Sequence, residues 1–333
     1  MRLPELGVDM RRREFITLAG GAAAFPIAAA RGQKKAVPVI GFLVAGTQAS
    51  HGAWVAAFAQ RLSELGWTEG RNINIEYRWA AGSTTKMASL AAEFVQQKVD
   101  VIVTSAYGAV AAKQATSTIP VVFAAYGDPV AGGLIHSLAR PGGNVTGLTV
   151  QATELNSKRL ELLRDIIPTI RRVEALINVS NPGASEEVSG IRTAAASLRI
   201  EAKVLEIRTA DEIGSALAGI KGRTDALYVF SEPLTNANKY QIIQVANAAK
   251  VPTIFGFREF VDAGGLVSYG PSFIDLFKRA AEFTDKILRG TKPVDIPVEQ
   301  PVKFDLIVSS KTARMLGLRI PETMLARADE VIE

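Results

Sequence analysis

From Val39 onward, short runs of β-branched and other apolar residues alternate with longer stretches rich in alanine and charged residues. The run 39–44 predicts a buried strand, and Trp54–Leu65 predicts a helix that ends at Gly66. The alternation continues with strands expected at 72–77, 99–104 and 120–124, and with helices expected at 84–97 and 109–115. Apolar strands that alternate with helices are typical of parallel sheets covered on both faces, so the pattern predicts an α/β fold.

The same order of elements recurs in the second half of the chain. The segments 99–103 and 119–123 have counterparts at 224–228 and 251–255, with similar spacing of a strand, a helix and a Pro-led strand. Further strands are expected at 173–179, 202–208, 226–230 and 252–255, and helices at 184–198, 211–220 and 236–249. The repeat predicts two Rossmann-like lobes, each built on a parallel sheet.

A third stretch of elements follows the second lobe. It holds an expected strand at 266–269, a helix at 273–288, a Pro-rich segment at 293–301, a strand at 303–308 and a helix at 310–316. We expect lobe one to comprise 37–150 and 266–292, and lobe two to comprise 151–265 and 300–333. The chain then crosses three times between the lobes, which makes a three-segment hinge.

Residues 1–30 have the pattern of an export signal. Arg11, Arg12 and Arg13 precede an uncharged apolar stretch that ends in three alanines, and Arg12-Arg13-x-Phe15-Ile16 resembles a twin-arginine motif. Translation could start at Met1 or at Met10. The apolar stretch is too short to span a bilayer, although a membrane-anchoring or buried N-terminal helix is the alternative. The signal predicts a periplasmic protein.

Composition narrows the classes of function. The chain has 333 residues, of which 48% are hydrophobic and 21% charged, enough for about two folded domains. Its 38 basic and 33 acidic residues are scattered, and without 1–30 the net charge is 34 − 30, or +4, so we expect no nucleic-acid partner. The absence of cysteine and the presence of only two histidines argue against a disulfide, a cysteine nucleophile and a multi-histidine metal site. We expect a monomer without metal or cofactor.

The loops at the carboxyl ends of the expected strands are rich in Ser, Thr, Asn and Gly. Ligands of open parallel sheets bind at these ends, where hydroxyls, amides and helix N-termini suit a carboxylate. The candidate ligand-binding residues are Thr47, Gln48, Ser105, Tyr107, Gly108, Asp128, Ser180, Asn181, Ser231 and Arg258.

Each of the main candidates also has a structural interpretation. Ser105 can donate to a carboxylate and Tyr107 can stack on an apolar group, or the two can be an N-cap and a packing tyrosine. Asp128 can meet a ligand amine or cap the following helix. His51 can hydrogen-bond a ligand or be a solvated residue at a helix start, and the pair Glu186-Glu187 is expected to be solvated on a surface helix.

The sequence lacks two nucleotide-binding motifs and one serine-hydrolase motif. It contains no Gly-x-Gly-x-x-Gly, no Gly-x-x-x-x-Gly-Lys-Ser/Thr and no Gly-x-Ser-x-Gly. Nucleotide binding and serine-hydrolase chemistry therefore lack support, and we expect no catalytic residues.

Four segments resemble the ABC-transporter substrate-binding proteins related to the tryptophan-transport type. They are 10–16, 58–70, 123–149 and 304–321, and the third contains the run Arg140-Pro-Gly-Gly-Asn-Val-Thr-Gly147. The resemblance implies a type I periplasmic-binding-protein fold that closes on a small ligand, such as an amino acid or another aromatic or carboxylate compound. It also implies delivery to the permease subunits of an ABC importer. The alternatives are a ligand-sensing partner of a membrane receptor and an exported α/β hydrolase.

Overall fold

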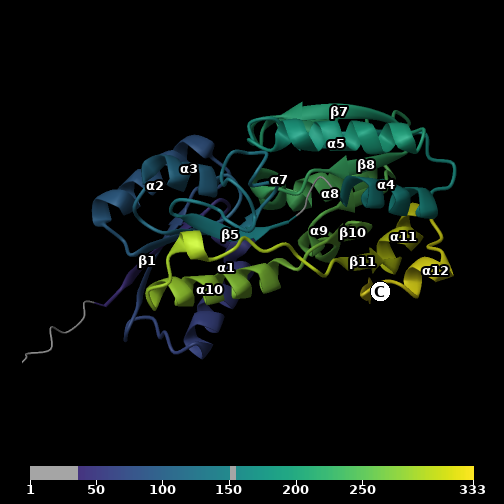
Figure 1. Ribbon diagram of the computed structural model, residues 1–333. Coiled ribbons are helices and arrows are strands. Elements are labelled where there is room, and N and C mark those ends of the chain that lie inside the picture. Colours follow the sequence, from purple (N-terminus) through teal and green to yellow (C-terminus); the bar gives the residue numbers. More distant parts are fainter. Residues whose placement is uncertain (1–36, 151–154) are drawn as a thin grey trace, which may run out of the picture. The chain divides into compact units, whose positions relative to one another are not determined.

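The computed structural model describes residues 37–150 and 155–333, so the expected export signal at 1–30 lies outside the described residues. The first sheet is parallel throughout and has the strand order β2-β1-β3-β4-β5 (Figure 1). Its strands are β1 (Val39–Val44), β2 (Asn74–Trp79), β3 (Val101–Thr104), β4 (Val121–Tyr126) and β5 (Val145–Thr149). The helices of this lobe are α1 (Gln48–Glu64), α2 (Thr84–Gln97), α3 (Gly108–Ala115) and α10 (Phe273–Leu288).

The second sheet has the order β12-β11-β10-β9-β8-β6-β7 and is parallel except for the antiparallel pair β10 and β11. Its strands are β6 (Arg172–Asn178), β7 (Glu201–Ile207), β8 (Ala226–Val229), β9 (Thr253–Phe255), β10 (Val267–Gly270), β11 (Asp305–Ser309) and β12 (Glu330–Ile332). The helices of this part of the chain are α4 (Leu155–Ile166), α5 (Ala184–Ser197), α6 (Glu212–Ala216), α7 (Pro233–Ala237), α8 (Lys239–Ala248), α9 (Arg258–Asp262), α11 (Ser310–Leu316) and α12 (Glu322–Leu325). A 3-10 turn, η1 (Pro293–Asp295), precedes the return to this sheet. The two sheets confirm the α/β architecture with two lobes.

The chain returns to lobe one a few residues later than the expected boundary at 266. Strand β10 pairs with β9 and β11 of the second sheet, whereas helix α10 packs against α1 and β4 of the first lobe. The crossing therefore lies at 270–273. The reason is that the backbone groups of β10 find their ladder partners in β9 and β11 of the second sheet.

Each lobe buries apolar side chains on both faces of its sheet. In lobe one, Phe42, Phe58 and Phe277 belong to one cluster, and Phe94 and Phe123 belong to the cluster on the opposite face. The second lobe also has two clusters, one on each face of its sheet. Each fully buried side chain of this size contributes about 1.5–3 kcal/mol, so both lobes have sizeable cores of their own.

The Pro-Gly-Gly-Asn-Val-Thr-Gly run leads into strand β5 and requires its glycines. Gly142 and Gly143 have φ of +75° and +68°, the left-handed region that favours glycine. At Gly147 a Cβ atom would lie 2.1 Å from the carbonyl oxygen of Phe123. A side chain there would push β5 away from β4, so the glycine is needed for strand pairing.

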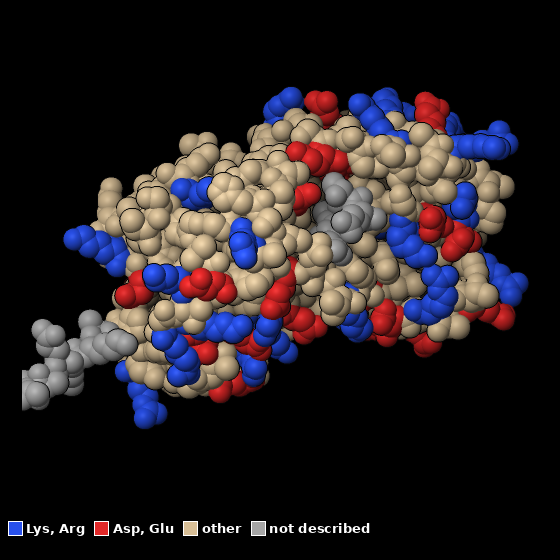
Figure 2. Space-filling model, in the orientation of Figure 1, with Lys and Arg blue, Asp and Glu red and all other residues tan. Residues whose placement is uncertain are grey.

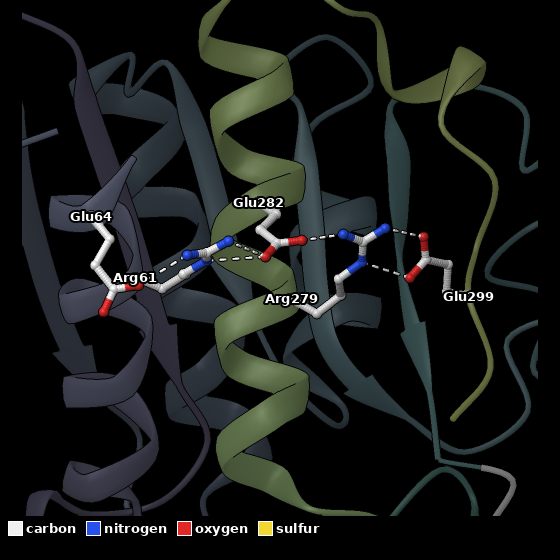
Figure 3. A network of polar contacts seen from close by, with 5 residues as sticks. All are labelled: Arg61, Glu64, Arg279, Glu282 and Glu299. Atoms are coloured by element: carbon white, nitrogen blue, oxygen red, sulfur yellow. Dashed lines mark hydrogen bonds and ion pairs between the residues drawn. The ribbon is translucent and has the colours of Figure 1, made fainter. Parts of the chain in front are cut away.

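A ladder of ion pairs links α1, α10 and the segment that leads out of lobe one (Figure 3). Arg61 lies 2.7 Å from Glu282, and Arg279 contacts both Glu282 and Glu299, the latter at 2.6 Å. Glu299 also forms a parallel bridge with Leu148 at the end of β5. Single exposed pairs contribute 1 kcal/mol or less, but the shared partners here hold the third crossing segment against lobe one.

On the face shown in Figure 2, basic and acidic side chains are interspersed over both lobes. Among the described residues, no helix combines the length and the apolar character that crossing a membrane requires.

Helix α1 begins with a capping box that leaves a histidine buried behind it. The side chain of Thr47 accepts a hydrogen bond from the backbone N–H of Ser50, whose hydroxyl in turn accepts from the backbone N–H of Thr47. His51, which is 2% exposed, lies 2.8 Å from the Ser50 hydroxyl through its Nδ1 atom. The expectation of a solvated His51 is therefore wrong. Burial, with a smaller contribution from Lys239, lowers the pKa of His51 to about 3.

The buried His51 predicts a loss of stability in mild acid. The folded state keeps the imidazole neutral down to about pH 3, whereas an unfolded chain protonates it near pH 6.5. Lowering the pH from 7 to 5 should therefore reduce the free energy of unfolding by about 2 kcal/mol through this residue. Urea denaturation at several pH values measures the effect. His51→Gln should remove most of this slope, and His136→Gln, which changes an exposed histidine, should keep it.

Candidate ligand-binding site

The loops that follow strands of both sheets surround one cavity of about 120 Å³. Residues after β3 and β4 contribute from the first lobe, and residues after β6, β8 and β9 contribute from the second. This is the position at which open parallel sheets bind ligands. The cavity volume is of the same order as the roughly 150 Å³ of a cavity that holds one benzene molecule, which is the scale of a single aromatic ring. The lining residues used below are His51, Trp54, Ser105, Tyr107, Tyr126, Asp128, Asn181, Gly183, Glu186, Glu187, Phe230, Ser231, Glu232, Phe257 and Phe273.

Aromatic rings form much of the wall. Trp54 stacks on Phe273 with ring centroids 4.5 Å apart, and Phe257 lies 4.2 Å from Phe273. Tyr107, Tyr126 and Phe230 also line the cavity. Trp54 comes from helix α1, whereas Phe257 follows β9 in the second lobe, so both lobes supply rings. Such walls favour a flat apolar group that can stack or make edge contacts.

Tyr107 lines the cavity and has a buried hydroxyl that is unsatisfied among the described residues. The residue is 3% exposed, and its hydroxyl has no hydrogen-bond partner among the described residues. Burial, together with the nearby charge of Glu232, raises the pKa of Tyr107 and keeps the phenol protonated. Because a buried polar group without a partner is costly, the hydroxyl is suited to a ligand atom.

Four carboxyl groups line the same cavity, namely those of Asp128, Glu186, Glu187 and Glu232. Glu232 is the N-cap of α7 and accepts from the backbone N–H of Thr235 at 2.9 Å. Burial raises the pKa of Glu232. Asp128 accepts from two backbone N–H groups of the loop after β4, both at 2.9 Å. No helix follows in 129–144, so the expectation of a helix cap is wrong; the side chain holds a turn, and the residue lines the cavity.

Glu187 belongs to a buried polar network beneath the cavity. The hydroxyl of Tyr228 donates to Glu187 at 2.6 Å, and Arg159 donates to Tyr228 at 2.9 Å. Burial raises the pKa of Glu187, and the charge of Arg159 opposes this. The expectation of two solvated glutamates is wrong for Glu187, which is 1% exposed, because helix α5 turns this side chain inward.

The ten candidates from the sequence divide into two groups. Those that line the cavity are Ser105, Tyr107, Asp128, Asn181 and Ser231. Ser231 accepts from the backbone N–H of Gly256 at 2.7 Å, and Asn181 accepts from the N–H of Gly183 at 2.9 Å. Both side chains therefore shape their loops and also face the cavity.

The other five candidates do not line the cavity, for physical reasons visible in the structure. Thr47 caps α1, and Gln48 and Ser180 are exposed. Gly108 lies against Thr104, whose Oγ1 would be 2.1 Å from a Cβ atom there. Arg258 is held outside by Glu330 at 2.8 Å and by Asp262 at 3.2 Å, so its guanidinium is already paired.

Several lining residues could not be identified from the sequence, because the local patterns around them are ordinary. Trp54 and Glu187 lie within helices and look like a core residue and a surface residue. Phe257 and Phe273 flank the crossing near 270, which the sequence did not place. The sequence feature that could have indicated them is the presence of aromatic residues at the ends of the strands, such as Phe230 before Ser231, and Phe257.

The chemistry of the cavity is that of binding. Among the described residues, no cluster of three or more His, Asp or Glu side chains could hold a metal ion. The polar groups that converge are neutral donors, carboxyls and one neutral imidazole. Together with the aromatic walls, these are typical of a pocket that orients a small organic ligand.

Comparison with known proteins agrees with this geometry. The family described as ABC transporter substrate binding protein matches residues 40–332. A tyrosine-binding protein of Clostridioides difficile (strain R20291) is 30% identical over 263 residues, which are 79% of this chain and 76% of that protein.

Two experimental structures are close in fold. A conserved domain protein of Vibrio cholerae is 27% identical, with a TM-score of 0.84 over 89% of this chain and 99% of that chain. The ABC domain in complex with L-Trp from Streptococcus pneumonia is 25% identical, with a TM-score of 0.83 and the same coverage. The family resemblance seen in the sequence is confirmed. This chain belongs to the ABC transporter substrate-binding protein family and has the type I periplasmic-binding-protein fold.

Proposed function

We propose that the protein captures an amino acid with an aromatic side chain between its two lobes and delivers it to the permease of an ABC importer. The observation that carries the proposal is the aromatic-walled cavity, which is lined by Tyr107, whose hydroxyl has no hydrogen-bond partner among the described residues. Rings from both lobes can enclose the side chain of the ligand, and the polar groups of the loops can receive its backbone end.

Both charged groups of an amino acid, the ammonium and the carboxylate, have suitable partners in the cavity. Its ammonium group suits the carboxyls of Asp128 and Glu186, which are the more accessible acids of the cavity. Its carboxylate suits neutral donors such as Ser105 and the N-terminus of helix α5. The N-cap of this helix, Gly183, supplies no side-chain hydrogen bond, which leaves the helix end open to a ligand.

The relatives support this class of ligand. One is named for tyrosine and another was determined in complex with L-Trp. Both ligands are amino acids with a flat aromatic side chain, which matches the wall formed by Trp54, Phe257 and Phe273. Export to the periplasm and delivery to an importer are further parts of the proposal, supported by the membership in this family.

A titration tests the ligand class directly. Isothermal calorimetry of the purified protein should show saturable binding of tyrosine, tryptophan or phenylalanine and much weaker binding of aspartate. Aspartate lacks a ring and brings a second negative charge to a cavity lined by four carboxyls. Equal binding of aspartate, or no binding of any aromatic amino acid, would contradict the proposal.

Tyr107→Phe should weaken the binding of the aromatic amino acid found in this titration about threefold to tenfold, which is the effect of one lost hydrogen bond. The unliganded melting temperature should stay the same or rise, since the variant removes a buried hydroxyl that has no partner among the described residues. Tyr240→Phe is the matched control, because Tyr240 is 68% exposed on α8 and outside the cavity. An unchanged dissociation constant for Tyr107→Phe would assign the residue to the core alone.

The three-segment hinge predicts closure on the ligand. A ligand that contacts both lobes binds the closed arrangement better and shifts the population toward it. Small-angle scattering should therefore show a smaller radius of gyration when a saturating aromatic amino acid is added. The same concentration of aspartate serves as the control. An identical scattering curve with a tightly bound ligand would rule out hinge closure.

A further inference from the structure

The two lobes also touch each other outside the ligand cavity. The side-chain Nδ2 of Asn236, on α7 of the second lobe, donates to the backbone carbonyl oxygen of Ser50, on α1 of lobe one, at 3.2 Å. Asn236 is 0% exposed, and neither Asn236 nor Ser50 lines the cavity. This hydrogen bond therefore joins the lobes without being part of the ligand site.

The same short helix makes a close apolar contact with lobe one. Leu234 of α7 approaches Gly82, in the turn after β2, so closely that a Cβ atom on the glycine would lie 3.6 Å from the Cα atom of Leu234. The backbone N–H of Gly82 donates to the carbonyl oxygen of Ala45 at 2.8 Å, which fixes the turn to the end of β1. Leu234 thus packs against an anchored part of lobe one and, like Asn236, does not line the cavity.

The strand order places the contact at Gly82 far from two of the three crossing segments. Strand β2 is one edge of the first sheet and β5 is the opposite edge. The first crossing follows β5, and the third crossing runs beside it, where Glu299 forms a bridge with Leu148. When two lobes rotate about their hinge segments, the points furthest from those segments move most. We therefore expect the contact at Gly82 to form on closure and to be lost on opening.

Helix α7 connects this contact to the ligand cavity. Its N-cap Glu232 and its first residue Pro233 line the cavity, whereas Leu234 and Asn236 of the same helix meet lobe one. The capping box between Glu232 and Thr235 fixes the start of the helix. One short helix therefore holds part of the cavity wall and the contact between the lobes in a fixed relation.

We propose that Leu234 and Asn236 of α7 form a latch that closes on Gly82 and Ser50 and determines ligand affinity without touching the ligand. A ligand that contacts both lobes binds the closed arrangement more tightly, so a contact that stabilises this arrangement lowers the apparent Kd by raising the closed population. This inference rests on the proposed function, because it concerns closure on the same amino acid. It assigns part of the affinity to residues outside the cavity.

Asn236→Asp tests the polar half of the latch. It replaces the donor Nδ2 with a carboxylate oxygen that faces the carbonyl oxygen of Ser50, so closure buries two acceptors against each other. Calorimetry at pH 7 should show the Kd values for tyrosine and tryptophan raised at least tenfold, and by the same factor within twofold. The factor is shared because the latch changes only the closed population. A Kd within threefold of the wild-type value, or factors for the two ligands that differ more than fivefold, would overturn the inference.

The matched control changes the same kind of bond within one lobe. Asn247 of α8 donates from Nδ2 to the carbonyl oxygen of Gly264 at 3.1 Å, and its Oδ1 atom, like that of Asn236, is buried without a partner among the described residues. Because both ends of this bond belong to the second lobe, Asn247→Asp should lower the melting temperature of the free protein and leave the Kd unchanged. A rise in Kd as large as that of Asn236→Asp would overturn the inference.

Leu234→Ala keeps the inference testable should Asn236→Asp fail to fold. Leu234 and Leu205 belong to the same apolar cluster and are 7% and 8% exposed, but Leu205 lies on β7, the outer edge strand of the second sheet. Both alanine variants should lower the melting temperature, and Leu234→Ala alone should raise the Kd, by at least threefold. Equal Kd values for the two variants would overturn the inference and leave the proposed function standing. A wild-type protein that binds neither tyrosine nor tryptophan would refute both.

Discussion

Everything about the site depends on parallel strands presenting their carboxyl ends at one edge of each sheet. In both lobes that edge carries the loops that line the cavity, from Ser105 and Asp128 on one side to Asn181, Ser231 and Phe257 on the other. Helices begin immediately after these loops, so backbone N–H groups and capping side chains gather there. A cavity between two such edges is therefore polar at its loops and apolar where the rings of the cores reach it.

Burying the carboxyls of Glu187 and Glu232 beside this cavity costs free energy, and the structure offsets the cost locally. Glu232 is satisfied by the N-terminal turn of α7 and by the amide of Asn178 at 3.2 Å. Glu187 is held by the hydroxyl of Tyr228, with Arg159 behind it. Replacing one member of such a network leaves the others desolvated without that partner, so each member stabilises the wall of the cavity.

The third crossing segment is held against lobe one. Glu299 is tied to Arg279 and pairs with Leu148, while α10 packs on α1 directly after the crossing at 270–273. The bond from the Trp54 indole to Glu259 connects the wall of the cavity to α9 of the other lobe.

The sequence alone determined the features that depend on local patterns. The alternation of apolar strands and helices, and its repetition, indicated two α/β lobes, and helix α10 has the bounds 273–288 expected from its pattern. The loop ends pointed to Ser105, Tyr107, Asp128, Asn181 and Ser231, because residues that follow parallel strands must lie at the binding edge.

Only the tertiary structure decided what each side chain meets. The pairing of β10 with the second sheet, the inward turn of Glu187 and the capture of Arg258 by Glu330 all depend on partners far away in the sequence. Local periodicity says which face of an element is apolar, but not which distant element covers it. Burial and ion pairing arise from that distant packing, and so the charge of the cavity could be recognised only once both lobes were in place.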